Sequence, residues 1–416
     1  MASWLTLFFA SALLLPPLPI VLGNSGPHVC LVFAAVGVLF GLASLVHWRI
    51  CPCSLNAAFT AFFGMLLASV ALAAIHSGAD VAVASLARVA LFGISVYIFF
   101  FAAYGQPGTT DTLKPARRLF LFAALSALFA CVDFYYQFPA PAGYGPQFVW
   151  LDVSVYRRAQ GVFYEASTLG NFCAFFLLMI AVALSRPARE YPISRKWLVA
   201  GGAPLFAALV LSFSRGSVIN VAVGLAVLVW INRRRISLRR VAATLAACVL
   251  AGSFLFAKIF PEIAAMYWLR LTASGQFFFS ATEQILSGRV ASWRTLLQWT
   301  AANPWELLFG VGYKTLPYTD YLGAPLVADN MYFSILIETG IAGLAALIWL
   351  NASILRAAAR SARRGSFYGA WMLCFWSGEA VQMLSGDLLT YWRVLPVYFF
   401  VLALAIRDEA AFSGSI

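Results

Sequence analysis

The chain alternates between long apolar runs and short polar connections. A helix that crosses a membrane needs about 20 mainly apolar residues, and the sequence contains about twelve runs near that length. They cover residues 4–22, 29–46, 55–75, 81–103, 119–138, 166–185, 197–213, 216–232, 241–260, 330–352, 366–385 and 391–406. The pattern predicts an all-α polytopic membrane protein, built as one integral membrane domain over residues 1–416.

The composition agrees with this fold class. Apolar residues make up 62% of the chain and charged residues 11%, whereas soluble domains hold about 45–50% and about 25%. The lipid bilayer is therefore the expected surrounding, and the net charge of +12 has to be interpreted by position and not as a sign of nucleic-acid binding. The N-terminal run has no basic residues before it, so we expect a first span and not a cleaved signal peptide. Three scattered histidines predict neither a metal site nor a cofactor.

The distribution of Lys and Arg predicts the orientation. Cytoplasmic loops of membrane proteins carry an excess of these residues. If the N-terminus is inside, most of the 28 Lys and Arg residues fall in cytoplasmic connections, and both termini are cytoplasmic. One segment, residues 261–329, then forms a long periplasmic connection between the ninth and tenth spans.

Some basic residues remain on the outer side in this topology. They are Arg157, Arg158, Arg215, Lys258, Arg270, Arg289, Arg294, Lys314 and Arg393. Because they depart from the usual bias, they are candidates for binding an anion that is presented only outside. Anchoring to lipid headgroups is the alternative.

Four ionisable residues lie inside the predicted spans, near their outer ends: Arg88, Asp133, Glu338 and Glu379. A charge at the centre of a membrane helix costs about 2.5–3.5 kcal/mol on insertion scales, so such residues usually face other helices or a cavity. Two interpretations stay open. The arginine extends outward while the acids pair structurally, or the four line a polar cavity in which Arg88 and Glu338 pair.

Four stretches on the predicted outer face carry most of the remaining polar residues. They are YRRAQGVFYEASTLGNF (156–172), LSFSRGSVIN (211–220), SGRVASWRTLLQWTAANPWELLFGVGY (287–313) and ADNMYFSILIETGIAGL (328–344). The third predicts a helix that begins after a Ser287 cap, ends near Asn303 and Pro304, and is followed by a Gly-x-Gly turn.

These stretches resemble the O-antigen ligase and O-antigen polymerase superfamily. The shared pattern is Arg-x-x-Gly-x-Phe before a span, Ser-Arg-Gly at a helix junction, Ser-Gly-Arg-x-x-x-Trp leading to Gly-x-Gly, and then Asn-x-Tyr and Glu-Thr-Gly. The resemblance covers residues 156–345. It implies a GT-C-like fold and a metal-independent glycosyltransferase of the bacterial inner membrane. Its donor would be a glycan linked to undecaprenyl pyrophosphate, used on the periplasmic side.

Arginine suits such a donor. Its guanidinium group is always protonated and grips phosphate oxygens bidentately, and a fixed cation can stabilise the charge that develops on a leaving group. By match to the motifs, Arg158, Arg215 and Arg289 are predicted to bind the pyrophosphate. The Asn-x-Tyr motif adds Asn330 and Tyr332 as substrate-binding candidates.

The sequence departs from the ligase pattern at one position. In the ligase branch a histidine precedes the Asn of the final motif, whereas this chain has Asp329. A carboxylate can also accept a proton from a sugar hydroxyl, so Asp329 is the candidate base and Glu165 the second choice. A purely structural role for Asp329, as the N-cap of the tenth span, is the alternative.

We therefore expect an enzyme that moves a glycan from the lipid donor to an acceptor glycan, as in O-antigen or exopolysaccharide polymerisation. The alternative is a ligase that transfers the glycan to lipid A–core or another acceptor. A transporter or flippase would show repeat symmetry and a charged site near the midplane. The sequence shows neither, so this third class is disfavoured.

Overall fold

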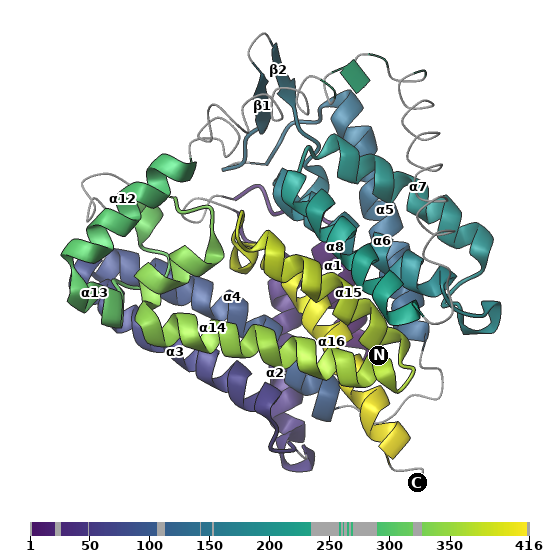
Figure 1. Ribbon diagram of the computed structural model, residues 1–416, viewed down its shortest axis with the longest axis horizontal. Coiled ribbons are helices and arrows are strands. Elements are labelled where there is room, and N and C mark those ends of the chain that lie inside the picture. Colours follow the sequence, from purple (N-terminus) through teal and green to yellow (C-terminus); the bar gives the residue numbers. More distant parts are fainter. Residues whose placement is uncertain are drawn as a thin grey trace.

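The computed structural model is a bundle of helices (Figure 1). It describes residues 2–20, 26–48, 50–105, 113–141, 143–151, 154–233, 289–318 and 327–413, together with residues 258, 261, 264, 265 and 268. The predicted span at 241–260 and most of the predicted periplasmic segment at 261–329 lie outside these residues.

The helices of the described part correspond closely to the apolar runs. They are α1 (Ser3–Leu14), α2 (Cys30–Ser44), α3 (Ser54–Ser77), α4 (Ala79–Tyr104), α5 (Lys114–Tyr136), α6 (Ala166–Leu184), α7 (Arg195–Leu211), α8 (Arg215–Asn232), α12 (Arg289–Ala302), α13 (Pro304–Phe309), α14 (Met331–Arg363), α15 (Phe367–Gln382) and α16 (Leu395–Ser413). Short 3₁₀ turns connect several of them. The predicted helix in the third motif is confirmed as α12, and α13 follows it at Pro304.

Two details differ from the prediction. The first run, expected to span residues 4–22, is helical only to Leu14. Two short antiparallel strands, β1 (Phe148–Leu151) and β2 (Ser154–Arg157), interrupt the helical architecture just before the first motif. In Figure 1 this hairpin projects above the helices.

Within the described part of the chain, seven helices are long and apolar enough to cross a membrane. They are Cys30–His47, Ser54–Ser77, Ala79–Tyr104, Lys114–Tyr136, Ala166–Leu184, Arg215–Asn232 and Met331–Arg363. The mostly helical membrane architecture is thus confirmed. The count of about twelve spans and the periplasmic placement of residues 261–329 stay predictions.

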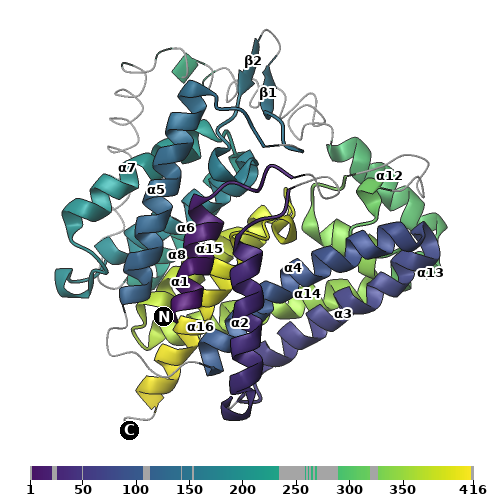
Figure 2. The same cartoon turned by 180° about the vertical axis from the view of Figure 1, so that it is seen from behind.

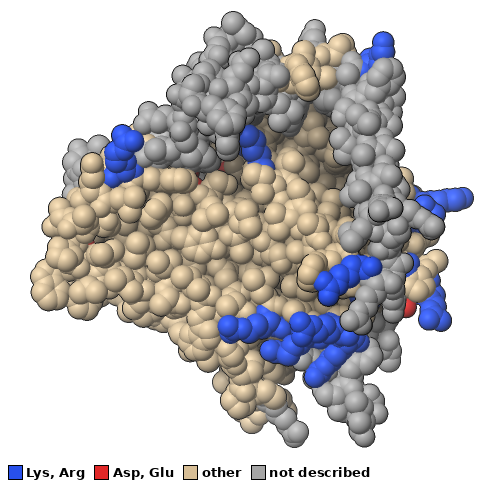
Figure 3. All heavy atoms as spheres, viewed as in Figure 1, with Lys and Arg blue, Asp and Glu red and all other residues tan. Residues whose placement is uncertain are grey.

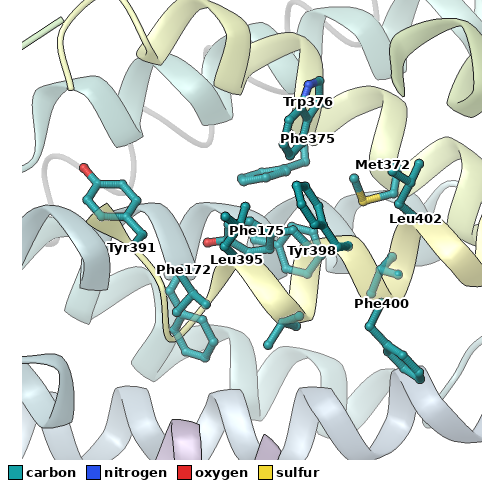
Figure 4. Close-up of a cluster of buried hydrophobic side chains, with 14 of the residues drawn as sticks. Phe172, Phe175, Met372, Phe375, Trp376, Tyr391, Leu395, Tyr398, Phe400 and Leu402 are labelled. Carbon is teal, nitrogen blue, oxygen red and sulfur yellow. The ribbon is translucent and has the colours of Figure 1, made fainter. Parts of the chain in front are cut away.

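The helices pack around a core of large aromatic side chains. Phe172 and Phe175 of α6, Phe375 of α15 and Tyr398 of α16 converge in it (Figure 4). Around this centre, α15 packs against α8, α14, α16 and α6, while α4 packs against α3 and α16. Seen from behind, α3 and α4 run side by side toward α13 (Figure 2).

The helix α14 is bent at Gly340, where φ is 73° and ψ is −176°. A positive φ is disfavoured for residues with a side chain, and glycine is the residue that adopts it without strain. An added Cβ at this position would lie 2.2 Å from the carbonyl oxygen of Leu308 in α13. The bend therefore lets α13 approach the backbone of α14 directly.

Candidate functional site

The segment that carries Arg158 lies against the turn that carries Arg215. The Arg158 Nε donates to the carbonyl oxygen of Ser212 at 2.8 Å, and the Ala159 amide donates to that of Leu211 at 2.8 Å. The last carbonyls of a helix have no partner within it, so the end of α7 offers these two acceptors. Arg215 follows as the first residue of α8. Two of the predicted pyrophosphate ligands are therefore neighbours.

A buried polar network lies below this turn and joins four helices. The Nδ2 atoms of Asn171 (α6) and Asn220 (α8) both donate to the Glu379 carboxylate and the Gln382 side-chain oxygen of α15. The Tyr398 hydroxyl of α16 donates to Asn171 Oδ1 at 2.6 Å. Buried polar groups with partners rigidify a core, so this network fixes the helices below Arg215. It also shows Glu379 engaged in a structural network with amides.

The start of α14 settles which residue caps this helix. The Asn330 side chain accepts hydrogen bonds from the amides of Tyr332 at 3.0 Å and Phe333 at 3.2 Å. The alternative that Asp329 is the N-cap is therefore wrong. Asp329 precedes the cap, is exposed, and has a φ of 45°. The Tyr332 hydroxyl donates to the carbonyl oxygen of Ala380 at 2.9 Å. Substrate binding by Asn330 and Tyr332 stays a prediction.

The helix α12 is attached to the same segment through Trp293. Its Nε1 donates to the carbonyl oxygen of Ala328 at 2.6 Å, and its ring packs against Phe333 with centroids 5.8 Å apart. Position 289 is the first of α12 and lies one turn before Trp293, on the same side of the helix. The third predicted arginine position and Asp329 are therefore on segments that contact each other.

The Gly-x-Gly turn after α13 docks onto the bend of α14. The amide of Val311 donates to the carbonyl oxygen of Ile337 at 3.0 Å, and that of Gly312 donates to Glu338 at 2.9 Å. Gly312 has a φ of 115°, and a Cβ there would lie 2.5 Å from the Cα of Ala73 in α3. Both glycines of this turn have positive φ. The turn serves as a contact between helices, and this contact accounts for its two glycines.

Directly after this turn, Lys314 forms an ion pair with Asp387. Asp387 lies in the connection of residues 383–394 between α15 and α16. Arg88 of α4 donates to the carbonyl oxygen of Lys314 at 3.1 Å. Burial by itself lowers the pKa of Lys314, but the charges of Asp387 and Glu338 outweigh it, and the net effect is a raised pKa. Lys314 is therefore held in its charged form.

Arg88 and Glu338 lie in the same charged cluster, while the direct pairing of the two that one interpretation of the sequence expects stays a prediction. Glu338 interacts electrostatically with Lys314, Asp387 and Arg88. Its Oε2 is buried and has no hydrogen-bond partner among the described residues. The printed hydrogen bond of Arg88 goes to the Lys314 carbonyl, so the cluster is organised around Lys314.

Glu165 lies close enough to Arg158 and to the Lys314–Asp387 pair to interact with their charges. It precedes α6, and its Oε2 accepts a hydrogen bond from the Thr168 hydroxyl at 2.6 Å. Its pKa is raised by burial, against the opposing effects of the Thr168 hydrogen bond and the charge of Arg158. Asp387 and Lys314 also act on it electrostatically. Glu165 is thus a carboxyl group beside Arg158 whose pKa is raised by burial.

Two of the outer basic residues have structural partners. Arg393 is buried and donates to the carbonyl oxygens of Ala12, Leu15 and Val162. Arg157 forms an ion pair with Asp133 at 3.8 Å. Lys314 is likewise paired, with Asp387. Among the residues that match the family motifs, the candidates for binding an anion stay Arg158, Arg215 and position 289.

Sequence reasoning did not identify Asp387 or the connection of residues 383–394. This connection contacts both the start of α14 and the start of α8. The Met331 amide donates to the Met383 carbonyl oxygen at 2.9 Å, and a Cβ on Gly216 would lie 3.1 Å from Ser385 Oγ. The signal available was the polar stretch Ser385-Gly386-Asp387 between the last two predicted spans.

Comparison with known families finds the same family that the motifs resemble. Residues 200–348 match the family model described as O-antigen ligase. Over this region the chain is similar to the O-antigen ligase family, which supports the resemblance to the O-antigen ligase and polymerase superfamily. The matched region of this superfamily includes Arg215, position 289 and Asp329, whereas Arg158, Glu165 and residues 383–394 lie beyond it. No curated protein matches the chain significantly.

The match over residues 200–348, together with the apolar helices of the described part, supports a multi-pass bacterial membrane protein of polysaccharide biosynthesis with glycosyltransferase-type activity. Among the described residues, no group of three or more His, Cys, Asp or Glu side chains is placed to hold a metal ion.

Proposed function

We propose that the protein transfers a glycan from undecaprenyl pyrophosphate to the end of an acceptor glycan, on the periplasmic face of the inner membrane. The main support is that the match over residues 200–348 includes segments that meet in the fold. The turn at Arg215 and the start of α14 both contact the connection of residues 383–394, and α12 contacts the segment that leads into Asp329. A polymerase-like reaction is the specific form that we propose.

The distribution of charge supports the orientation. On the face shown in Figure 3, most visible Lys and Arg side chains gather along the lower and right edges. The start of α1 and the end of α16 lie toward the lower right in Figure 1, which supports cytoplasmic termini under the positive-inside rule. The β1–β2 hairpin and α12, which lie next to candidate residues in the sequence, are away from these edges in Figure 1.

In the proposed reaction, Arg158, Arg215 and Arg289 hold the pyrophosphate of the donor. The acceptor hydroxyl attacks the anomeric carbon of the donor sugar, the bond from this carbon to the phosphate oxygen breaks, and undecaprenyl pyrophosphate leaves. The arginines stabilise the negative charge that develops on this leaving group. We expect inversion at the anomeric carbon because the attack is direct.

A carboxylate accepts the proton of the attacking hydroxyl. Asp329 is next to the segment contacted by α12, and Glu165 is beside Arg158 with a raised pKa. A general base works best when its pKa lies near the working pH, and the upward direction of the pKa shift at Glu165 is the one that a carboxylate base at neutral pH requires. Conservative amide variants of both residues separate the two assignments.

The proposed polymerase activity is preferred over ligase activity because Asp329 occupies the position of the ligase histidine. Ligation to lipid A–core is the second candidate. Both use the same donor and the same leaving group, so only the product distinguishes them.

The test uses Arg215→Ala and Arg289→Ala in the native host, at membrane protein levels equal to wild type. Arg189→Ala is the control, since that side chain is 85% exposed on a distant connection. If long surface chains collapse to single repeat units still attached to their acceptor, the polymerase assignment is supported. Loss of glycan from the lipid core with accumulation of lipid-linked polymer identifies a ligase. An unchanged profile in both variants would overturn the proposed function, because neither arginine would then be needed to hold the donor.

A further inference from the structure

The candidate site consists of two groups of residues on different helices. The first group is Arg158, Glu165 and Arg215, positioned by α6, α7 and α8. The second group is the start of α12 and the segment from Asp329 to Tyr332, positioned by α14. A reaction that uses both groups requires that their spacing be fixed, because small displacements of binding residues reduce rates strongly.

Lys314 belongs to the second group through the chain. It follows the Gly310–Gly312 turn, which is bonded to the carbonyls of Ile337 and Glu338 at the bend of α14. Its own carbonyl accepts a hydrogen bond from Arg88, and its backbone has a φ of 59°. The position of its side chain is therefore set by α14 and α4.

Asp387 is attached to the first group, and Met383 in the same connection also contacts Met331 of the second group. It lies in the connection of residues 383–394, which begins at the end of α15, where Gln382 is bonded to Asn171 and Asn220. Its carboxylate also accepts from the Leu389 amide at 3.0 Å, which fixes the side chain on the backbone. Asp387 and Lys314 both act electrostatically on Glu165. The Lys314–Asp387 pair is thus a direct link between the two groups.

We propose that Lys314 and Asp387 are positioning residues, whose ion pair sets the spacing between the Arg158–Arg215 side and the α12–Asp329 side. The inference rests on the proposed function, since it assumes that both sides act on one donor. The pair is nearly buried, with side-chain exposures of 10% and 12%, so water does not compete strongly for the contact. A buried ion pair holds its two segments in one relative position, because the charged groups must meet, whereas an apolar contact allows them to shift.

The experiment separates positioning from simple core filling. Lys314→Met with Asp387→Leu replaces the pair by apolar side chains of similar size, a change that usually preserves stability. Lys314→Asp with Asp387→Lys reverses the pair and keeps the attraction. Each double variant is expressed in the native host at matched membrane levels, its thermal unfolding is measured in detergent, and its surface glycan is resolved on gels beside Arg215→Ala.

The expected result is that the apolar pair unfolds at the wild-type temperature but makes at least tenfold less polymer, while the reversed pair recovers more polymer than the apolar pair. Wild-type polymer from the apolar pair would overturn the inference, because the ion pair would then only fill space. A folded but inactive reversed pair, equal to the apolar one, would also overturn it and assign Lys314 an individual chemical role.

The Arg215→Ala lane distinguishes failure of the positioning role of the ion pair from failure of the proposed function. If Arg215→Ala loses polymer and the apolar pair does not, the inference fails and the proposed function stands. If glycan is unchanged in every variant, including Arg215→Ala, the proposed function itself fails. If either double variant does not fold, Lys314→Arg with Asp387→Glu is measured in its place. A lengthened pair of this kind is expected to keep the fold and lower polymer yield severalfold, and full yield contradicts positioning.

Discussion

The indole Nε1 of Trp293 lies 2.6 Å from the carbonyl oxygen of Ala328, and this bond attaches α12 to the segment that leads into Asp329. We expect Trp293→Phe to lower polymer yield by about two- to tenfold, since it removes one hydrogen bond worth about 0.5–1.5 kcal/mol and keeps the packing on Phe333. Gel densitometry at equal protein levels measures this. A Trp293→Phe strain with wild-type yield would show that the bond does not position α12 for the reaction.

The Gly310–Gly312 turn gives a prediction about assembly. Gly312→Ala introduces a side chain at a φ of 115°, and its Cβ meets the Ala73 backbone at 2.5 Å. Forcing a residue with a side chain into such a region costs about 1–3 kcal/mol before the clash is counted. We expect a clear loss of folded protein in size-exclusion profiles. Gly64→Ala is the matched control, because a Cβ there has no neighbour within 4 Å, and it should leave the profile unchanged.

Arg393 should matter for folding and not for activity per folded molecule. Arg393→Met leaves the carbonyl oxygens of Ala12, Leu15 and Val162 without this donor. Each buried acceptor that loses its partner costs about 1–3 kcal/mol. The unfolding temperature in detergent should fall, while polymer made per folded molecule stays within twofold, as roughly expected when no group at the site is removed. A specific loss of activity at full stability would contradict this.

Glu165 predicts a pH dependence with opposite signs for activity and stability. Because burial raises its pKa above the usual 4.5, the folded protein favours the protonated form. Its contribution to stability is fully present below the unfolded pKa and is lost as pH rises through the raised folded pKa. Activity as a base has the opposite trend and rises over the same range. Rate profiles of purified protein, compared with Glu165→Gln, measure this.

The Gln variant should be much less active and should lack the rise with pH. If Glu165→Gln keeps both the rate and the profile, Asp329 is the better candidate for the base, and Asp329→Asn becomes the variant to examine in the same assay.

The buried network below Arg215 predicts a stability effect at Tyr398. Tyr398→Phe leaves Asn171 Oδ1 without the donor that lies 2.6 Å away, and an unsatisfied buried acceptor costs about 1–3 kcal/mol. Thermal unfolding in detergent should show a lower midpoint. Tyr135→Phe is a suitable control since Tyr135 is 78% exposed. Equal midpoints for the two variants would mean that the network tolerates the loss.

The sequence predicted the helices well because apolar length alone identifies a membrane helix, and Arg-rich connections mark one side. It also placed Arg158, Arg215, position 289 and Asp329 on a common side of the fold. The end of α1 at Leu14 and the bend at Gly340 were not predictable from length, because an apolar run continues through both. The alternative role of Asp329 as the cap of α14 was off by one residue because Asp and Asn have similar preferences for that position.

The partners of the charged residues could not be predicted either. Lys314 and Asp387 are 73 residues apart, and Arg393 bonds to the carbonyl of Ala12 across 381 residues. Backbone carbonyls have no signature in a sequence, so Arg393 and a phosphate-binding arginine have the same appearance there. Only the packing of α1 against the start of α16 distinguishes them.

The docking of the Gly310–Gly312 turn also constrains the order in which the protein matures. The turn contacts Ala73 of α3 and the carbonyls of Ile337 and Glu338 in α14, yet ribosomes complete α3 long before α14. The amides of Val311 and Gly312 therefore lack their native acceptors until Ile337 and Glu338 have been synthesised. A nascent chain stalled before α14 would leave the Gly310–Gly312 turn undocked, so the insertion of α14 is the step that completes this part of the molecule during biogenesis.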